Sequence, residues 1–157
     1  MNINFGRTHN GKSIEILIIK EPKYIDWLLN ESTSPTSKMC DAQIEANRLI
    51  AKFDNMPFIE KCEVKNCNQT ATRFVLYVGT LLGGSVHPSW WCDNCDPYDS
   101  GSSQNHLEIL KSYKEAISYA SSYKLTKSGW KSLIRDIFEA KGLPKTVNEA
   151  RAIAFFQ

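Results

Sequence analysis

Two short cysteine pairs carry the strongest structural signal in the chain. The first reads Cys62-Glu63-Val64-Lys65-Asn66-Cys67, and the second, twenty-four residues later, reads Cys92-Asp93-Asn94-Cys95. Each pair suits a tight turn whose backbone amides stabilise thiolate charge, and a β-hairpin between the pairs would bring the turns together. The spacing therefore predicts one closed tetrahedral metal site with four cysteine ligands: Cys62, Cys67, Cys92 and Cys95.

Zinc is the metal expected at such a site, because four thiolates in a closed shell suit Zn²⁺ better than they suit an iron–sulfur cluster. With four protein ligands no position is open for water, so the single Zn²⁺ would be structural. The x4 spacing of the first pair is less common than x2. Four metal-free thiols remain the alternative, as does His87 in place of one cysteine. Cys40 is expected to be a small buried residue.

The segment between the pairs indicates a small sheet. Thr70 to Val78 alternates apolar and other residues as a strand does, Gly83-Gly84 marks a turn, and Ser85 to Trp91 is the expected partner strand. Asn66 and Asn94 fit turn positions inside the cysteine loops. Residues 60–98, with Trp90-Trp91 leading into the second pair, resemble a zinc ribbon. Zinc ribbons serve in transcription, replication and recombination proteins and as protein-docking modules.

The first 38 residues predict a hairpin followed by a helix. Asn10-Gly11 suits a two-residue turn, with Ser13 to Ile19 as the apolar returning strand. A helix is expected to begin at Pro22, and residues 30–38 are rich in Ser, Thr and Pro, as in a loop.

Residues 4–29 resemble the small C-terminal domain of exodeoxyribonuclease X-like proteins, which also occurs as a stand-alone bacterial and phage module. The resemblance covers about a fifth of the chain and implies association with DNA-processing proteins, without catalytic residues. It is carried by a set of matching positions: Phe5, Gly6, Arg7, Gly11, Lys12, Ser13, Ile14, Pro22, Tyr24, Ile25, Trp27 and Leu28. The aromatic members of this set, with Leu28, are expected to form the core of the module rather than a stacking platform.

The remaining segments predict helices, which makes the chain an α+β protein. A connecting segment at 39–59 holds a helix over Asp41 to Phe53, with its apolar residues on one face. A C-terminal unit at 103–157 holds three helices: one opened by a capping box of Asn105 and Glu108 and running to about Tyr123, one over Lys127 to Lys141, and one opened by Thr146 with Glu149 and ending at Phe156.

Composition places the chain among folded globular proteins. Of its 157 residues, 42% are hydrophobic and 23% charged, and the net charge of +2 is too mild to identify a nucleic-acid partner by itself. The start of the chain lacks the pattern of a signal peptide, and its longest apolar run is far short of a membrane span. A cytoplasmic location without membrane contact is therefore expected, and cysteines in a reducing compartment favour metal over disulfides.

Positive charge is arranged in two places that suit phosphate. Lys127, Lys131 and Arg135 follow a four-residue step along one helix face, with Lys124 just upstream. Arg7 and Lys12 flank the glycine-containing turn near the N-terminus and would present charge to a phosphate. The alternative for both sets is an ordinary solvated surface.

The expected function is therefore binding rather than catalysis. The histidines fall in separate segments, and no phosphate-binding glycine loop precedes a Lys-Ser/Thr pair, so a metal-dependent nuclease is the less favoured possibility. A zinc-binding accessory protein that contacts nucleic acid, DNA rather than RNA, or a nucleoprotein complex fits best. The alternative is a protein–protein interaction module, such as a phage-encoded modulator of a host or defence complex, whose contact would be exposed aromatics: Trp90, Trp91, Phe155 and Phe156.

Overall fold

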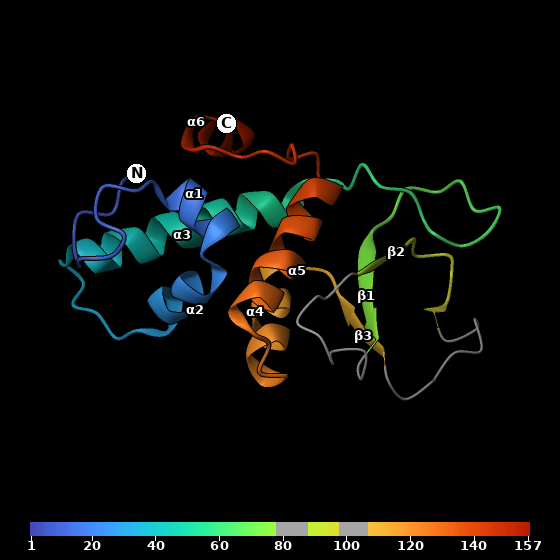
Figure 1. Cartoon of the computed structure of the whole chain (residues 1–157), viewed down its shortest axis with the longest axis horizontal. Coiled ribbons are helices and arrows are strands. Elements are labelled where there is room, and N and C mark those ends of the chain that lie inside the picture. Colours follow the sequence, from blue (N-terminus) through green and yellow to red (C-terminus); the bar gives the residue numbers. More distant parts are fainter. Residues whose placement is uncertain (78–87, 98–106) are drawn as a thin grey trace.

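The computed structural model describes residues 1–77, 88–97 and 107–157 and shows an α+β fold (Figure 1). Six helices and a three-stranded antiparallel sheet make up this part of the chain. The elements in order are α1 (Ile14–Lys20), α2 (Pro22–Asn30), α3 (Lys38–Asn55), β1 (Arg73–Tyr77), β2 (Ser89–Trp91), β3 (Leu107–Leu110), α4 (Tyr113–Ser122), α5 (Lys127–Ala140) and α6 (Glu149–Phe155). Helices α4 and α5 lie between α1–α3 on one side and the sheet with the cysteine turns on the other (Figure 1).

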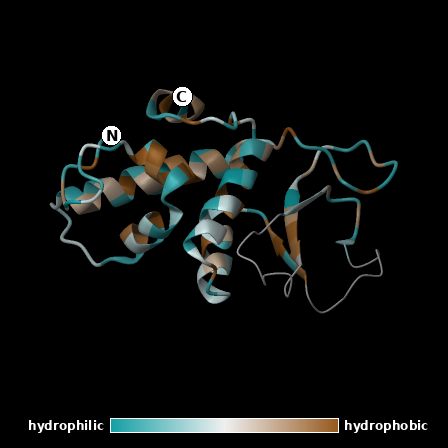
Figure 2. Ribbon diagram, viewed as in Figure 1, coloured by the Kyte–Doolittle hydropathy of each residue, from teal (hydrophilic) through white to brown (hydrophobic). Residues whose placement is uncertain are grey.

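A buried core joins the helices to one part of the sheet. Its largest fully buried side chains include Tyr113, Phe53, Phe74 and Phe138. Phe53 stacks on Phe138 with ring centroids 4.0 Å apart. Strongly hydrophobic residues are concentrated in α1 and in the sheet (Figure 2). Since this core runs from Ile3 to Phe156, it contains residues from every predicted segment, and the division into four segments stays a prediction.

The predicted N-terminal hairpin is wrong in its second strand. A single antiparallel bridge joins Asn2 to Ser13, after which the chain enters helix α1. Every residue from Ile14 to Ile19 is buried. A helix buried on all sides shows no amphipathic period, and its β-branched residues imitate a buried strand. Packing against α3, α5 and α6 outweighs their β-propensity.

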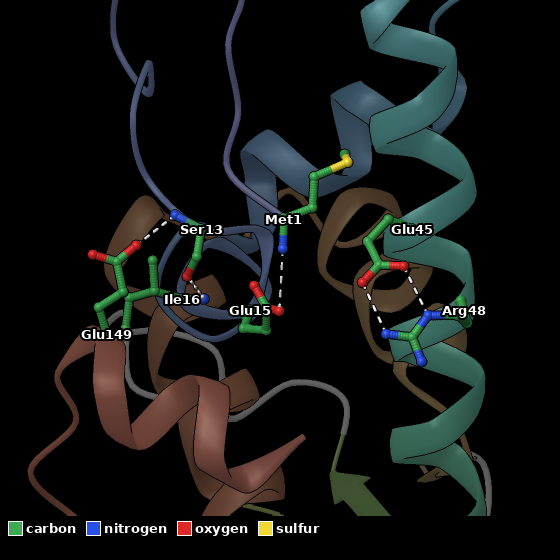
Figure 3. Close-up of polar contacts among 7 residues, drawn as sticks. All are labelled: Met1, Ser13, Glu15, Ile16, Glu45, Arg48 and Glu149. Atoms are coloured by element: carbon green, nitrogen blue, oxygen red, sulfur yellow. Dashed lines mark hydrogen bonds and ion pairs between the residues drawn. The ribbon is translucent and has the colours of Figure 1, made fainter. Parts of the chain in front are cut away.

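The N-terminal ends of α1 and α6 are joined by a hydrogen bond (Figure 3). The backbone N–H of Ser13 donates to Glu149 Oε1 at 2.6 Å, while Ser13 Oγ caps α1 by accepting from the N–H of Ile16. Nearby, the amino group of Met1 lies 3.4 Å from Glu15 (Figure 3). The predicted capping box of Thr146 with Glu149 is therefore wrong, because Asn148 caps α6 and Glu149 bonds to Ser13.

The predicted helix from Asn105 to Tyr123 is wrong at its beginning. Residues 107–110 form strand β3, which pairs with β1 in the order β2-β1-β3. Helix α4 begins later, where Ser112 Oγ accepts from the N–H of Glu115 and the Glu115 carboxylate accepts from the N–H of Lys111. Glu108 therefore lies in a strand, and Asn105 is outside the described residues.

Three helices and two strands lie close to their predicted positions. Helices α2, α3 and α5 match the predicted segments to within a few residues, and Gly142 ends α5 with a φ of +99°. Strand β1 pairs with β2 in the register Phe74↔Trp90, as the hairpin prediction requires. The Gly83-Gly84 turn between them is outside the described residues. Within the described ranges, no helix has both the length and the apolar character needed to cross a bilayer.

Candidate metal centre and basic groove

The first cysteine turn is closed by backbone hydrogen bonds. An antiparallel bridge joins Lys61 to Thr70, and the N–H of Cys62 donates to Gln69 O at 2.9 Å. Within the turn, the N–H of Cys67 donates to Val64 O at 2.9 Å, and Asn66 takes a left-handed φ of +67°. The prediction that Asn66 occupies such a turn position is confirmed, since asparagine tolerates this conformation better than most residues.

Arg73 holds the second cysteine turn against strand β1. Its Nη2 donates to the carbonyl oxygens of Cys92 and Cys95. Thr72 Oγ1, in the residue just before β1, donates to Asp93 at 2.9 Å and gives the turn a second attachment. Asn94 lies in the turn, as predicted, but without the left-handed φ that Asn66 adopts.

The two turns bring four sulfur atoms together. The Sγ atoms of Cys62, Cys67, Cys92 and Cys95 all lie within 4.8 Å of one another. Cys67 Sγ lies 3.8 Å from the Sγ atoms of both Cys92 and Cys95. With a Zn–S bond of about 2.3 Å, the edge of a regular sulfur tetrahedron is about 3.8 Å. The sulfurs therefore have the spacing that a tetrahedral metal ion requires.

The thiols of the cluster differ in acidity. Burial acts to raise the pKa of Cys92, but hydrogen bonds from the Asn94 N–H and from neighbouring thiols outweigh it and lower that pKa from 9.0 to about 7. The hydrogen bond with Cys92, together with burial, raises the pKa of Cys95 to about 12. A divalent ion would supply the positive charge that lets cysteine ligands ionise together.

The fifth cysteine does not join the cluster. Cys40, predicted to be buried, is only partly buried at the start of α3 and is not part of it. His87, the alternative ligand, lies outside the described residues.

A cavity of about 680 Å³ lies where α5 faces the α1–α2 junction and the segment that follows α5. Four cationic side chains line it, with Glu21 as the single acidic one: Lys20, Lys131, Arg135 and Lys145. A smaller neighbouring cavity is lined by Lys12 and Glu149, and it shares Lys20 and Glu21 with the first. We call the two together the basic groove. The carriers of its charge come from four separate segments of the chain.

Some cations of the groove are paired and others are not. Lys131 Nζ lies 3.0 Å from Glu21, and Arg135 lies 3.7 Å from Glu139. Burial acts to raise the pKa of the Glu21 carboxyl, but the hydrogen bond from Lys131 outweighs this effect and lowers that pKa. By contrast, Lys12, Lys20 and Lys145 form no salt bridge within the described part of the chain.

The predicted phosphate-contacting residues fall into three places. Lys12, Lys131 and Arg135 line the basic groove, and Lys127 belongs to the same helix and acts electrostatically on Glu21. Arg7 lines a different cavity, described below. Lys124, with a φ of +51°, ends helix α4 and lines none of these cavities.

Lys20 and Lys145 are groove residues that sequence reasoning missed. Each is one cation at the end of an element or in a loop, and neither belongs to a periodic pattern. Because only folding brings them beside α5, no local signal pointed to them.

The aromatic residues predicted to be an exposed contact are largely covered. Trp91 and Phe156 are 7% and 4% exposed, and Trp90 and Phe155 pack against the core. The opposite correction applies to Trp27, which was expected in the core and is 45% exposed.

Searches of protein-family models, curated proteins and solved structures found no match to this chain.

Proposed function

We propose that the protein is a zinc-binding accessory protein that contacts nucleic acid, DNA rather than RNA, through the basic groove. The observation that carries the proposal is the convergence of five cationic side chains from four segments on the basic groove, which holds two acidic side chains, Glu21 and Glu149. Zinc would stabilise the cysteine turns, which lie on the far side of α4 and α5 from helices α1–α3 (Figure 1). The role of the metal is therefore structural.

The choice of zinc follows from the chemistry of the donors. Four thiol ligands select soft or borderline metals over Mg²⁺ and Ca²⁺. The sulfur spacing of 3.8 Å suits one tetrahedral ion. Two of the sulfurs, those of Cys62 and Cys92, are buried, as expected for a site that holds its ion permanently.

The choice of nucleic acid follows from the placement of charge. Lysines without a carboxylate partner can neutralise backbone phosphates and displace the counterions condensed on the nucleic acid. The release of these counterions provides most of the affinity of sequence-independent binding. Among the residues that line the groove, Lys12, Lys20 and Lys145 are such lysines. The resemblance of residues 4–29 to a module of DNA-processing proteins supports the same partner class.

The test is an electrophoretic shift assay with short single-stranded and duplex DNA. We expect the triple variant Lys12→Gln, Lys20→Gln, Lys145→Gln to lose most binding and to reduce the slope of log affinity against log salt by about 3. These three lysines are chosen because their removal breaks no salt bridge, whereas removal of Lys131 would leave the Glu21 carboxylate without its partner.

The matched control removes three exposed lysines outside the groove: Lys61, Lys111 and Lys114. It carries the same net charge as the groove variant. Equal loss of binding by both variants would show that net charge, not the groove, attracts DNA. If the unmodified protein retains no DNA at low salt, the proposal fails, and a protein-interaction role becomes the better hypothesis.

A further inference from the structure

A second cavity, of about 430 Å³, lies beside the N-terminal turn. Its walls are mainly aromatic, with one cation: Phe5, Arg7, His9, Tyr24, Trp27 and Met39. The His9 and Tyr24 rings are 4.3 Å apart between centroids, and Tyr24 and Trp27 are 5.4 Å apart with an interplanar angle of 35°. We call this cavity the aromatic pocket.

The aromatic pocket is not part of the hydrophobic core. Helix α2 packs into the core through Ile25 and Leu28, both fully buried. Trp27 faces away from them and leaves 45% of its surface exposed. An indole at that exposure forgoes a large part of the stabilisation that burial would give, and its exposed surface is able to contact a ligand.

The charge around the pocket selects an anionic ligand. His9 lines the aromatic pocket and experiences the charges of basic-groove residues, among them Lys12, Glu21 and Lys131. Burial, followed by the charge of Lys12, lowers the pKa of His9, which keeps the ring neutral at pH 7. Arg7 adds a positive charge to the pocket wall. An aromatic cage for a quaternary ammonium group would need the opposite surroundings.

From the aromatic pocket and the nearby cations of the basic groove we infer that the protein binds single-stranded nucleic acid, with one unpaired base stacked on Trp27 and the neighbouring phosphates in the groove. A flat base matches the open face of the indole, and the negative backbone matches the adjoining cations. In a duplex each base is already stacked and paired, so its faces are not available to the pocket. The inference rests on the proposed function and narrows its ligand to single strands.

The experiment compares two ligands of equal length and charge on the intact protein. One is a fluorescein-labelled oligothymidylate, and the other has the same phosphates with a tetrahydrofuran abasic unit at every position. We expect the unmodified protein to bind the thymidylate strand at least about tenfold more tightly than the abasic strand and than duplex DNA. Trp27→Leu should bind the two single strands equally, and Trp27→Phe should restore most of the preference, because a phenyl ring still stacks.

The possible outcomes separate this inference from the function on which it rests. Equal binding of thymidylate and abasic strands by the unmodified protein overturns base stacking, and the groove proposal then stands if the lysine variant is still defective. A preference that persists in Trp27→Leu places the base elsewhere and also overturns the inference. Binding of no oligonucleotide at all sinks both proposals. The comparison of ligands needs no mutation, so it decides the question even if Trp27→Leu fails to fold.

Discussion

At the scale of single residues, Arg73 links the strand to the metal centre. Its guanidinium group donates to the carbonyl oxygens of both cysteines in the second turn. We expect Arg73→Met to lower zinc affinity by about 10- to 100-fold, since groups that orient metal ligands commonly contribute this much. Competition with a chromophoric chelator measures the change.

Lys65→Met is the control for Arg73, because Lys65 is an exposed cation inside the first cysteine turn. The Lys65→Met substitution removes one positive charge near the site, and in the described part of the chain the Lys65 side chain makes no hydrogen bond to the cysteine turns. If both variants weaken zinc binding equally, Arg73 acts through its charge and not by holding the turn.

Lys141 is a buried cation that follows α5, and its side chain caps the C-terminal end of helix α3. Its Nζ donates to the carbonyl oxygens of Phe53 at 2.8 Å and Asp54 at 3.1 Å, and it lies 4.4 Å from the centre of the Phe53 ring. Burial lowers its pKa, with Asp54 acting in the opposite direction. We expect Lys141→Met to reduce the free energy of unfolding by about 1–3 kcal/mol, because the two carbonyls lose their partner. Urea denaturation measures this loss, and Lys23→Met, at an exposed site on α2, should change it little.

At the scale of elements, helix α4 begins later in the structure than the sequence predicts, after its cap Ser112. Ser112→Ala removes the side chain that accepts from the Glu115 N–H and should lower stability by about 1 kcal/mol. Ser118→Ala lies on the exposed face of the same helix and should be neutral or slightly stabilising, because alanine has the higher helix propensity. Thermal unfolding of the pair checks this. Equal stability of the two variants would contradict a helix that begins after Ser112.

The elements that the sequence predicted well share one property, a single buried face. Helix α5 shows it: Trp130, Leu133 and Ile137 are buried on one side, and Lys127 and Arg135 are exposed on the other. Such helices can be recognised locally by their period. Helix α1 lacks a polar face, so its period could not distinguish it from a buried strand.

Features that depend on distant contacts could not be predicted. Strand β3 is recognisable only through its pairing with β1, more than thirty residues earlier. The same holds for the basic groove and the aromatic pocket, whose walls come from segments far apart in the chain. The cysteine cluster was predictable because thiol spacing carries chemical information of its own.

At the scale of the whole molecule, the metal should support one part of the structure more than the rest. The small cluster beside the cysteine turns consists of Val75, Trp91 and Leu107, whereas the main core extends through all six helices. We therefore expect chelation to abolish amide protection first in residues 60–72 and 88–97, while α1, α3 and α5 keep theirs. Hydrogen exchange followed by mass spectrometry measures this. Simultaneous loss of protection in the helices would mean that the metal centre and the core unfold as one unit.

We propose above all that four sulfurs from two distant turns hold one zinc ion. X-ray absorption at the zinc edge, combined with elemental analysis of purified protein, tests it most directly. We predict one zinc per chain, surrounded by four sulfur atoms at about 2.3 Å. Protein that contains no stoichiometric metal, or zinc with nitrogen or oxygen in its first shell, would contradict the account.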